Sequence, residues 1–424
     1  MSIPALKLPR LVQAAHAAID PEGFFRLGAR RGDPFRVRLP GVGEIHVTGH
    51  PDGARDVFTA DPETFATVPQ NPIEALLGPG SLILRSGASH TRERRLLLPP
   101  FHGDRMRAYG ETMRAATLAA LARLRPGAPF VAQELTRAIT LQVIVRAVFG
   151  IEGERERAAS ERAVLDMLAA YTPPLMLVPA LRRSLGGAGP WARFVRARAA
   201  FDALLREQIA RRRAAPGEDI LSLLVAARHD DGSGLAEAEL LDELRTLLVA
   251  GHDTSAGALA WALYYLHARP ELAERARSAG SEYVAAVVSE ALRLHPVVPI
   301  VLRRLRAPLV LRGTRLPAGA NVAVATSLLH ARADLYPEPR RFDPERFVAR
   351  RYSPFEYAPF GGGHRRCLGA AFATFELRTV LETLLAHGRF ALAGGQRAPR
   401  PVLQGITSSA NRDIRMTYEG RVQP

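Results

Sequence analysis

The chain has 424 residues, and its 57 Lys and Arg against 42 Asp and Glu give a formal net charge of +15. Hydrophobic residues make up 47% of it, which is enough for a sizeable core and excludes a disordered protein. Its one cysteine, Cys367, excludes a disulfide framework and any zinc or iron–sulfur site that needs several cysteines.

The basic excess does not predict nucleic-acid binding. Lys7 is the only lysine, and the other basic residues are arginines interleaved with Asp and Glu. No run of five or six like charges occurs, so we expect no nucleic-acid partner. The lone lysine also excludes a Walker A phosphate loop and, in the body of the chain, Schiff-base chemistry.

Membrane and export signals are missing from the sequence pattern. No stretch reaches the roughly 18 uninterrupted apolar residues of a membrane span. Residues 1–20 lack the apolar block and cleavage site of a signal peptide. We therefore expect a soluble, cytoplasmic protein without a membrane anchor.

The first elements along the chain include strands. Residues 34–48 alternate around a Pro-Gly pair and predict a β-hairpin. Short helices are expected at 51–60 and 89–98, the second ended by two prolines. This pattern predicts a β-rich N-terminal part at about residues 20–65.

The middle of the chain, about residues 85–295, is predicted to be mostly helical. Clusters of Pro and Gly interrupt the pattern at residues 125–127, 172–174, 186–190 and 216–217. The longest expected helix covers residues 235–268, with an apolar stripe of Leu240, Leu241, Leu244, Leu247 and Leu248.

The last third of the chain mixes several element types. Short strands are expected at 296–325, a Pro-rich coil at 333–360 and a long helix at 368–387, followed by more short strands. Neither an internal repeat nor a linker between domains stands out. The whole pattern predicts a mainly α protein with a minor β region, folded as a single large unit over residues 1–424.

The strongest chemical signal surrounds the cysteine, in the string FGGGHRRCLG at residues 360–369. A following helix N-terminus and neighbouring arginines favour the thiolate form of Cys367. Glycines let the backbone pass close to a flat ligand. Taken separately, a lone cysteine is most often an inert buried side chain, and a glycine run is most often a turn.

The complete string resembles the haem-binding loop of the cytochrome P450 family of haem-thiolate monooxygenases, F-x-x-G-x-R-x-C-x-G. The fixed positions are all matched, by Phe360, Gly363, Arg365, Cys367 and Gly369. The resemblance covers the chain from about residue 20 onward and implies the fold of the bacterial P450s. It also implies that Cys367 is the axial ligand of the iron of haem b, with Phe360 and Gly369 beside the cofactor.

Glu290 and Arg293 stand three residues apart on a predicted helix, a spacing that ordinarily gives a surface ion pair. They resemble the family's E-x-x-R motif, and residues 344–347 resemble its P-E-R-F motif. The resemblance implies a buried structural network of Glu290, Arg293 and Arg346, which fixes the coil behind the haem.

The string AGHDT at residues 250–254 lies inside the longest expected helix. Gly and Thr lower helix propensity, and a Thr hydroxyl can bond the preceding turn, so a tolerated kink is one interpretation. The string also resembles the family's A-G-x-[D/E]-T. That resemblance implies a distorted helix that admits dioxygen, with Ala250 beside the haem and with Asp253 and Thr254 as catalytic residues that deliver protons.

His90 and Arg94, four residues apart on a predicted helix, form either a solvated basic face or a grip on a shared anion. They resemble the H-x-x-x-R pair that holds the haem propionates. The resemblance gives the same role to Arg365 and to an arginine after the E-x-x-R helix. Arg303 matches that arginine best, and the neighbouring Arg304 is the alternative.

The resemblance implies a monomeric monooxygenase that hydroxylates a small molecule with O2. Its electrons are expected to come from a separate ferredoxin or flavodoxin and its reductase, because the chain has no spare length for such a domain. A peroxide-driven peroxygenase and a non-catalytic haem sensor are the alternatives. Peroxide-using relatives tend to lack the acid–alcohol pair, and a sensor usually carries an output domain.

The substrate class is predicted from side chains that the motifs place around the haem. These are Leu247, Ala250, Val298, Ile300, Ile406 and Thr407. The loops at 66–85 and 170–190 are expected to close over them. The apolar lining favours a terpenoid, fatty acid or steroid. Arginine side chains on the cysteine side are expected to bind an acidic electron donor, the candidates being Arg95, Arg350, Arg351 and Arg366.

Overall fold

The computed structural model describes residues 3–39, 41–67, 71–103, 105–184, 186–404 and 407–422. Helices make up most of this part of the chain. They are α1 (Arg10–Ile19), α2 (Pro21–Ala29), α3 (Pro51–Phe58), α4 (Glu74–Leu77), α5 (Gly87–Leu97), α6 (Arg105–Leu121), α7 (Ala132–Val143), α8 (Glu154–Ala170), α9 (Pro173–Leu177), α10 (Gly189–Ala214), α11 (Ile220–Ala226), α12 (Glu237–Ala268), α13 (Pro270–Ala279), α14 (Ser281–Leu294), α15 (Thr326–Leu329), α16 (Glu345–Ala349) and α17 (Ala370–His387).

The strands form small sheets. The largest has the order β1-β2-β8-β5-β3 and contains β1 (Phe35–Leu39), β2 (Gly43–Thr48), β8 (Asn321–Val324), β5 (Val301–Leu305) and β3 (Phe65–Ala66). A second sheet has the order β4-β12-β9, from β4 (Pro129–Val131), β12 (Arg415–Arg421) and β9 (Gly388–Leu392). Two-stranded pairs are β6 (Leu309–Leu311) with β7 (Thr314–Leu316), and β10 (Pro401–Gln404) with β11 (Thr407–Ala410).

The predicted hairpin at 34–48 is confirmed. β1 and β2 pair antiparallel, with Phe35 opposite Val47 and Val37 opposite Ile45. These four side chains are buried and alternate with polar ones, so one face of the hairpin joins the core. β2 then pairs in parallel with β8, which links the N-terminal segment to the last third of the chain.

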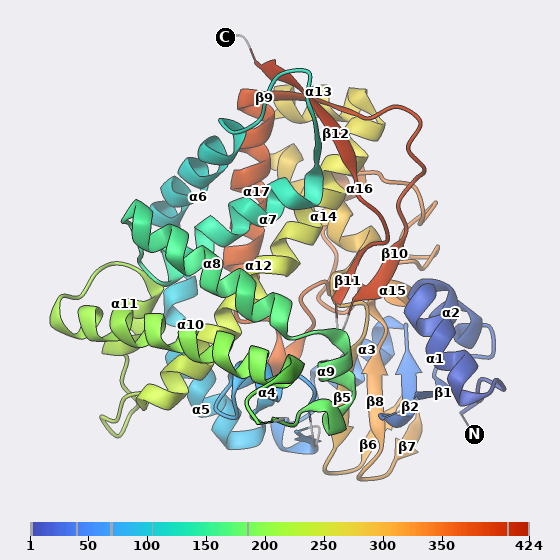
Figure 1. Ribbon diagram of the computed structural model, residues 1–424. Helices are drawn as coiled ribbons and strands as arrows, with labels where there is room; N and C mark the ends of the chain where they lie inside the picture. Colours follow the sequence, from blue (N-terminus) through green and yellow to red (C-terminus); the bar gives the residue numbers. More distant parts are fainter. Residues whose placement is uncertain are drawn as a thin grey trace.

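The N-terminal part is more helical than the sequence pattern suggested, because α1 and α2, which the pattern did not predict, accompany its strands (Figure 1), whereas α3 is the short helix expected at 51–60. The Asp20 side chain accepts a hydrogen bond from the Gly23 N–H (2.9 Å), and Pro21 occupies the first position of α2. An acidic cap followed by proline is a typical helix start. α2 then buries Phe24 and Phe25 against the sheet side of the molecule.

α12 is the long helix predicted at 235–268, and it runs through the helical part of the molecule (Figure 1). Of its predicted apolar stripe, Leu247 is half-buried and the other four leucines are buried. Each predicted break at Pro and Gly falls between two elements or at the start of one. The predicted fold class, mainly helical with small sheets, is confirmed.

None of the helices in the described ranges combines the length and the apolar character that crossing a membrane requires.

Candidate active site

Cys367 lies in the loop that leads into α17, and the shape of this loop depends on a glycine. The Cys367 N–H donates to the Phe360 carbonyl (2.9 Å), and the Arg366 N–H donates to the Gly363 carbonyl (3.0 Å). Gly363 has φ of +66°, and a Cβ there would lie 1.9 Å from the carbonyl oxygen of Phe58, the last residue of α3. The loop therefore packs backbone against backbone, as only glycine allows.

The Cys367 side chain is exposed toward a cavity of about 530 Å³. Most of the surroundings of the sulfur are protein atoms, and this burial raises the pKa of the Cys367 thiol. The Gly369 N–H and the guanidinium groups of Arg94 and Arg366 act against that shift and favour the thiolate. The thiolate is the form that binds a metal ion.

The cavity beside Cys367 carries a positive lining. Arg94, Arg366, Arg378 and His102 line it together with the apolar ring of Phe375. Of the arginines that the sequence nominated for donor binding, only Arg366 lies in this lining. Arg95 and Arg351 are exposed elsewhere, and Arg350 is paired with Glu356 at 2.7 Å.

Basic side chains from three elements gather around the short 3-10 turn Gly363–Arg365, and the arginines among them carry the positive charge. They are Arg303 from β5, His90 from α5, and His364 and Arg365 from the turn itself. The His90 and His364 rings lie 6.0 Å apart. Burial, followed by the charge of Arg365, lowers the pKa of Arg303 to about 9 and that of His90 to about 3.

Among the described residues no Asp or Glu forms an ion pair with this cluster, and Asp61 has only a minor effect on the pKa of His364. Arg365 donates to the carbonyls of Arg85 (2.7 Å) and Ile83 (3.2 Å), and Arg303 donates to the Leu302 carbonyl (2.9 Å). Burying cations without an anion is costly. The cluster is therefore suited to a ligand that brings its own carboxylates.

The structure also separates the two arginines that the sequence could not distinguish. Arg303 is among the charges that act on His90 and His364, and Arg365 in turn acts on Arg303, whereas Arg304 is not among these charges. Arg94 acts on His90, His364 and the Cys367 thiol, so it lies between the cationic cluster and the cavity.

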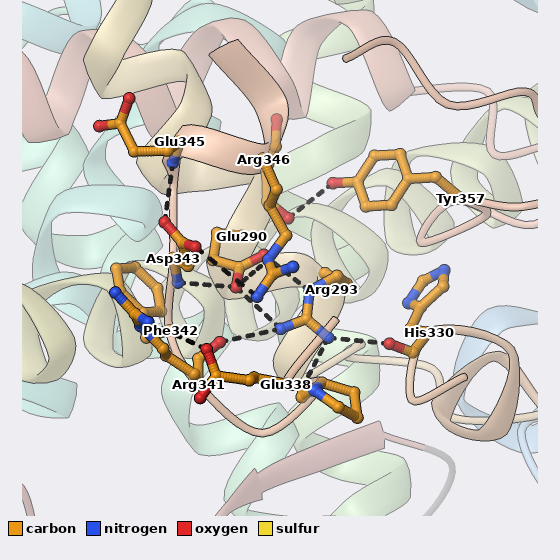
Figure 2. Close-up of polar contacts among 12 residues, drawn as sticks. Glu290, Arg293, His330, Glu338, Arg341, Phe342, Asp343, Glu345, Arg346 and Tyr357 are labelled. Carbon is orange, nitrogen blue, oxygen red and sulfur yellow. Dashed lines mark hydrogen bonds and ion pairs between the residues drawn. The ribbon is translucent and has the colours of Figure 1, made fainter. Parts of the chain in front are cut away.

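Glu290, Arg293 and Arg346 meet in one buried network (Figure 2). Arg293 grips both Glu290 oxygens from Nε (2.6 Å) and Nη2 (2.8 Å), and Arg346 Nε donates to Glu290 Oε1 (3.1 Å). Arg293 also donates to the His330 and Pro339 carbonyls, each at 2.8 Å. The network thus fastens the coil after α15 to α14. Asp343 Oδ2, 3.9 Å from Arg346 Nη2, supplies the second negative charge that balances the two arginines.

The AGHDT segment lies inside a continuous helix, and one of its side chains bonds the preceding turn. α12 is helical without interruption from Glu237 to Ala268. Thr254 Oγ1 donates to the Ala250 carbonyl (2.5 Å), which is the bond to the preceding turn considered above. Gly251 serves close packing, because a Cβ there would lie 2.7 Å from Ile144 Cδ1. The helix irregularity in this region lies in the segment that faces Gly251: residues Ile144–Val148, which follow α7, form a π-helical turn.

Two side chains of α7 form hydrogen bonds with Asp253 and His252, the residues directly before Thr254. Arg137 Nε donates to Asp253 Oδ1 (3.1 Å), and Thr140 Oγ1 lies 3.0 Å from His252 Nδ1. Burial lowers the pKa of His252. The sequence analysis missed Arg137, Thr140 and His252. His252 stands inside a recognised motif, whereas the two α7 residues carry no signal of their own.

The predicted pocket residues come from three segments that meet. Leu247 is half-buried on α12, and β11, which begins with Thr407, packs against the same helix. The Ser408 N–H donates to the Val297 carbonyl (2.7 Å), which brings β11 beside the chain that carries Val298 and Ile300. Ala250 is exposed on α12, and Ile406 lies outside the described residues.

The two loops expected to close over this pocket are bonded to each other. The Tyr171 hydroxyl donates to the Pro72 carbonyl. Arg198 of α10 donates to the Ala75 carbonyl (2.5 Å), and Arg182 donates to the Leu175 and Met176 carbonyls within its own loop.

Comparison with known proteins agrees with this geometry. Residues 10–413 match the family model described as Cytochrome P450. "Putative cytochrome P450 138" of Mycobacterium tuberculosis is 34% identical over 401 residues, covering 91% of this chain and 89% of the relative. "Putative cytochrome P450 135B1" of the same species is 40% identical over 402 residues, covering 91% and 84%.

Solved structures show the same fold. The retinoic acid-bound cyanobacterial CYP120A1 superposes with a TM-score of 0.82 at 27% identity, covering 99% of both chains. The cytochrome P450DA heme domain superposes with a TM-score of 0.85 at 22% identity, covering 99% of this chain and 98% of the other.

The chain therefore belongs to the cytochrome P450 family, and it is an enzyme of the P450 monooxygenase class. The predicted family, enzyme class and haem-thiolate cofactor are confirmed at this level. The residues described above fit that cofactor. A cationic cluster without a counterion suits the two propionates, and the thiol of Cys367 suits the iron.

Proposed function

We propose that this enzyme hydroxylates a largely apolar small molecule, with O2 and with electrons from a separate donor protein. The observation that carries the proposal is the joining, in one short loop, of an accessible thiol and a buried cationic cluster without a counterion. In the proposal Cys367 ligates the iron, and His90, Arg94, Arg303 and Arg365 bind the propionates.

The haem supplies dioxygen activation when it is bound, because a thiolate ligand favours O–O cleavage. The protein supplies the surroundings. The Gly369 N–H and nearby arginines stabilise the negative charge on sulfur. Phe360 accepts the Cys367 N–H and so holds the loop closed.

Proton delivery is assigned to Asp253 and Thr254. The Thr254 hydroxyl is half-buried on α12 and can turn from the Ala250 carbonyl toward the pocket. Adjacent helix residues point about 100° apart, so Asp253 lies on the side that solvent reaches. Its contact with Arg137 supports a role in passing protons inward from solvent.

An apolar substrate is supported by the side chains that meet at β11 and α12. Val298 is exposed although it is apolar, and Leu247 and Ile300 are only partly covered. The cyanobacterial relative binds retinoic acid, an isoprenoid. We therefore propose a terpenoid, fatty acid or steroid as the substrate.

The proposed electron donor is an acidic ferredoxin or flavodoxin with its reductase. The positive lining of the cavity beside Cys367 supports this choice, because complementary charge steers association. We place the reaction in the cytoplasm, since an unpaired thiol suits a reducing compartment.

We also propose that the described residues act as one P450 domain. The largest buried apolar cluster draws on elements from α4 to α17, which supports a single folding unit.

The test of the proposal is the Cys367→His variant. The reduced, carbon monoxide-bound enzyme is expected to show the thiolate absorption band, and the variant is expected to lose that band and the hydroxylation. An unchanged spectrum in the variant would contradict the assignment. Substrates are then sought by titrating terpenoids, fatty acids and steroids and following the haem absorption. Comparing product from reduced ferredoxin with product from hydrogen peroxide alone tests the peroxygenase alternative.

A further inference from the structure

Tyr265 of α12 forms its side-chain hydrogen bond with a histidine. Its hydroxyl lies 2.8 Å from His295 Nε2, and the two rings are nearly parallel, with 14° between their planes. His295 follows α14 and is buried, and burial lowers its pKa to about 3. The ring is therefore neutral at pH 7, so one of its nitrogens carries a free lone pair.

The surroundings of His295 indicate which nitrogen carries the proton. Nδ1 forms no hydrogen bond among the described residues, and the nearest charged acceptor is Glu22 Oε1 at 3.9 Å. A proton on Nδ1 faces this carboxylate, and Nε2 is then left as the acceptor. Tyr265 is thus the donor, and its phenolic proton already points at a base.

Two further aromatic rings stack on this pair, one on His295 and one on Tyr265. The Trp261 ring stacks on His295 with centroids 3.7 Å apart and 15° between the planes. The Phe342 ring stacks on Tyr265 with centroids 4.5 Å apart and 4° between the planes. Trp261 is buried and stands seven residues after Thr254, about 10 Å along the axis of α12.

We propose that Tyr265 is a redox-active residue that protects the enzyme, by giving an electron to the haem site through Trp261 while its proton moves to His295. The proposal rests on the proposed function, because the oxidant is a haem that hydrogen peroxide, a by-product of unproductive turnover, has oxidised. A buried tyrosine with a packing role also takes a hydrogen-bond partner, so the radical signal distinguishes the redox role from packing.

The electron count balances over two rounds of tyrosine oxidation. Reducing one hydrogen peroxide to two water molecules breaks its O–O bond and takes two electrons from the haem site and two protons from solvent. In each round Tyr265 returns one electron to the haem site while its proton passes from Oη to His295 Nε2, which leaves a neutral phenoxyl radical and an imidazolium near Glu22 and Arg293. One electron from the donor protein and the proton on His295 then restore the phenol, so each peroxide consumes two donor electrons.

Tyr264 provides a matched control within the same helix. Its ring lies 5.1 Å from that of Tyr265, and no hydrogen bond to a histidine is found for it in the described part of the chain. Tyr264→Phe and Tyr265→Phe therefore remove the same atom from neighbouring positions, and only the second removes the pair with His295.

The experiment mixes the haem-loaded enzyme with hydrogen peroxide, without substrate, and freezes it for electron paramagnetic resonance. A tyrosyl signal is expected in the parent and in Tyr264→Phe, and its loss is expected in Tyr265→Phe. Haem bleaching by peroxide is expected to become several-fold faster in Tyr265→Phe only. Equal signals and equal bleaching in the two variants would overturn the proposal.

A second variant covers the case in which Tyr265→Phe does not retain haem. His295→Gln keeps an acceptor for the hydroxyl but cannot take up the proton, so the radical yield is expected to fall in it as well. An unchanged yield in His295→Gln would also overturn the proposal. Failure of the parent to show the thiolate band with carbon monoxide would instead contradict the proposed function.

Discussion

Arg137 on α7 donates from Nε to Asp253 Oδ1 on α12, across 3.1 Å and between residues 116 apart in the sequence. About half of each side chain is exposed, so solvent reaches the carboxylate. The ion pair therefore fixes Asp253 at the surface end of the turn that carries Thr254. Replacing Arg137 breaks this ion pair and leaves the carboxylate of Asp253 in place, so the roles of the two residues can be measured separately.

Asp253→Asn is expected to slow turnover, because proton supply then limits the reaction. A positioned proton donor contributes about 10²–10⁴-fold in rate, which gives the range of the loss. Turnover with saturating substrate and donor is the measurement. Arg137→Gln keeps the acid and removes only its anchor, so it serves as the control and is expected to lose less activity. Parent-like turnover in Asp253→Asn would remove this residue from the proton route.

Thr254→Ala is expected to keep haem binding and reductant consumption while diverting oxygen to hydrogen peroxide. The variant lacks the hydroxyl that we propose turns toward the pocket, whereas the helix stays intact because alanine favours it. The ratio of product to reductant consumed measures the effect. Thr254→Ser retains the hydroxyl and is expected to remain coupled. If Thr254→Ala forms as much product per reductant as the parent, the hydroxyl has no part in proton delivery and only bonds the Ala250 carbonyl.

Glu290→Ala is expected to abolish folding or haem retention. It leaves the buried Arg293 without its anion, and breaking such a pair costs roughly 3–5 kcal/mol. The matched control is Glu111→Ala, which breaks an exposed pair with Arg114 at the same spacing. The control is expected to change the free energy of unfolding by less than about 1 kcal/mol. Denaturant unfolding and haem content measure both variants, and similar results for the two would contradict a structural network.

Arg366→Glu is expected to slow reduction by an acidic donor by about tenfold at low salt, because it reverses a charge in the cavity lining. In the parent enzyme the rate is expected to fall as salt rises. Stopped-flow reduction is the measurement, after the carbon monoxide spectrum has shown that the haem site is intact. Arg350→Glu changes an arginine that is already paired with Glu356, and it serves as the control. Salt-independent reduction in the parent would argue against docking at this cavity.

The elements that could be predicted from sequence are those with a local pattern. The hairpin from Phe35 to Thr48 follows from alternation, and α12 follows from its leucine stripe. Glu290 and Arg293 follow from a short motif on one helix face. Asp20 and Pro21 form a typical helix cap and therefore indicate where α2 begins. The apolar residues of α2 give too short a pattern to predict the helix itself.

Other contacts depend on tertiary placement. Arg137 reaches Asp253 only because α7 crosses α12, and nothing near Arg137 in the sequence indicates that crossing. Arg303 and Arg304 differ only in which face of β5 they occupy. A strand's facing is set by its register with its neighbours, here Val322 and Asn321 of β8. Gly251 was expected to open the helix for dioxygen, and its packing role, which is to make room for Ile144 of the neighbouring segment, has no signal in the sequence.

Because Gly363 packs closely against the carbonyl of Phe58, the end of α3 helps to set the shape of the cysteine loop. The segment that shapes the surroundings of the sulfur is thus more than 300 positions away from it in the chain. Laboratory evolution aimed at the sulfur's donor strength therefore need not alter the loop. Substituting the Phe58 ring, which also packs over Gly362, would retune the thiolate from outside and leave all the signature residues in place.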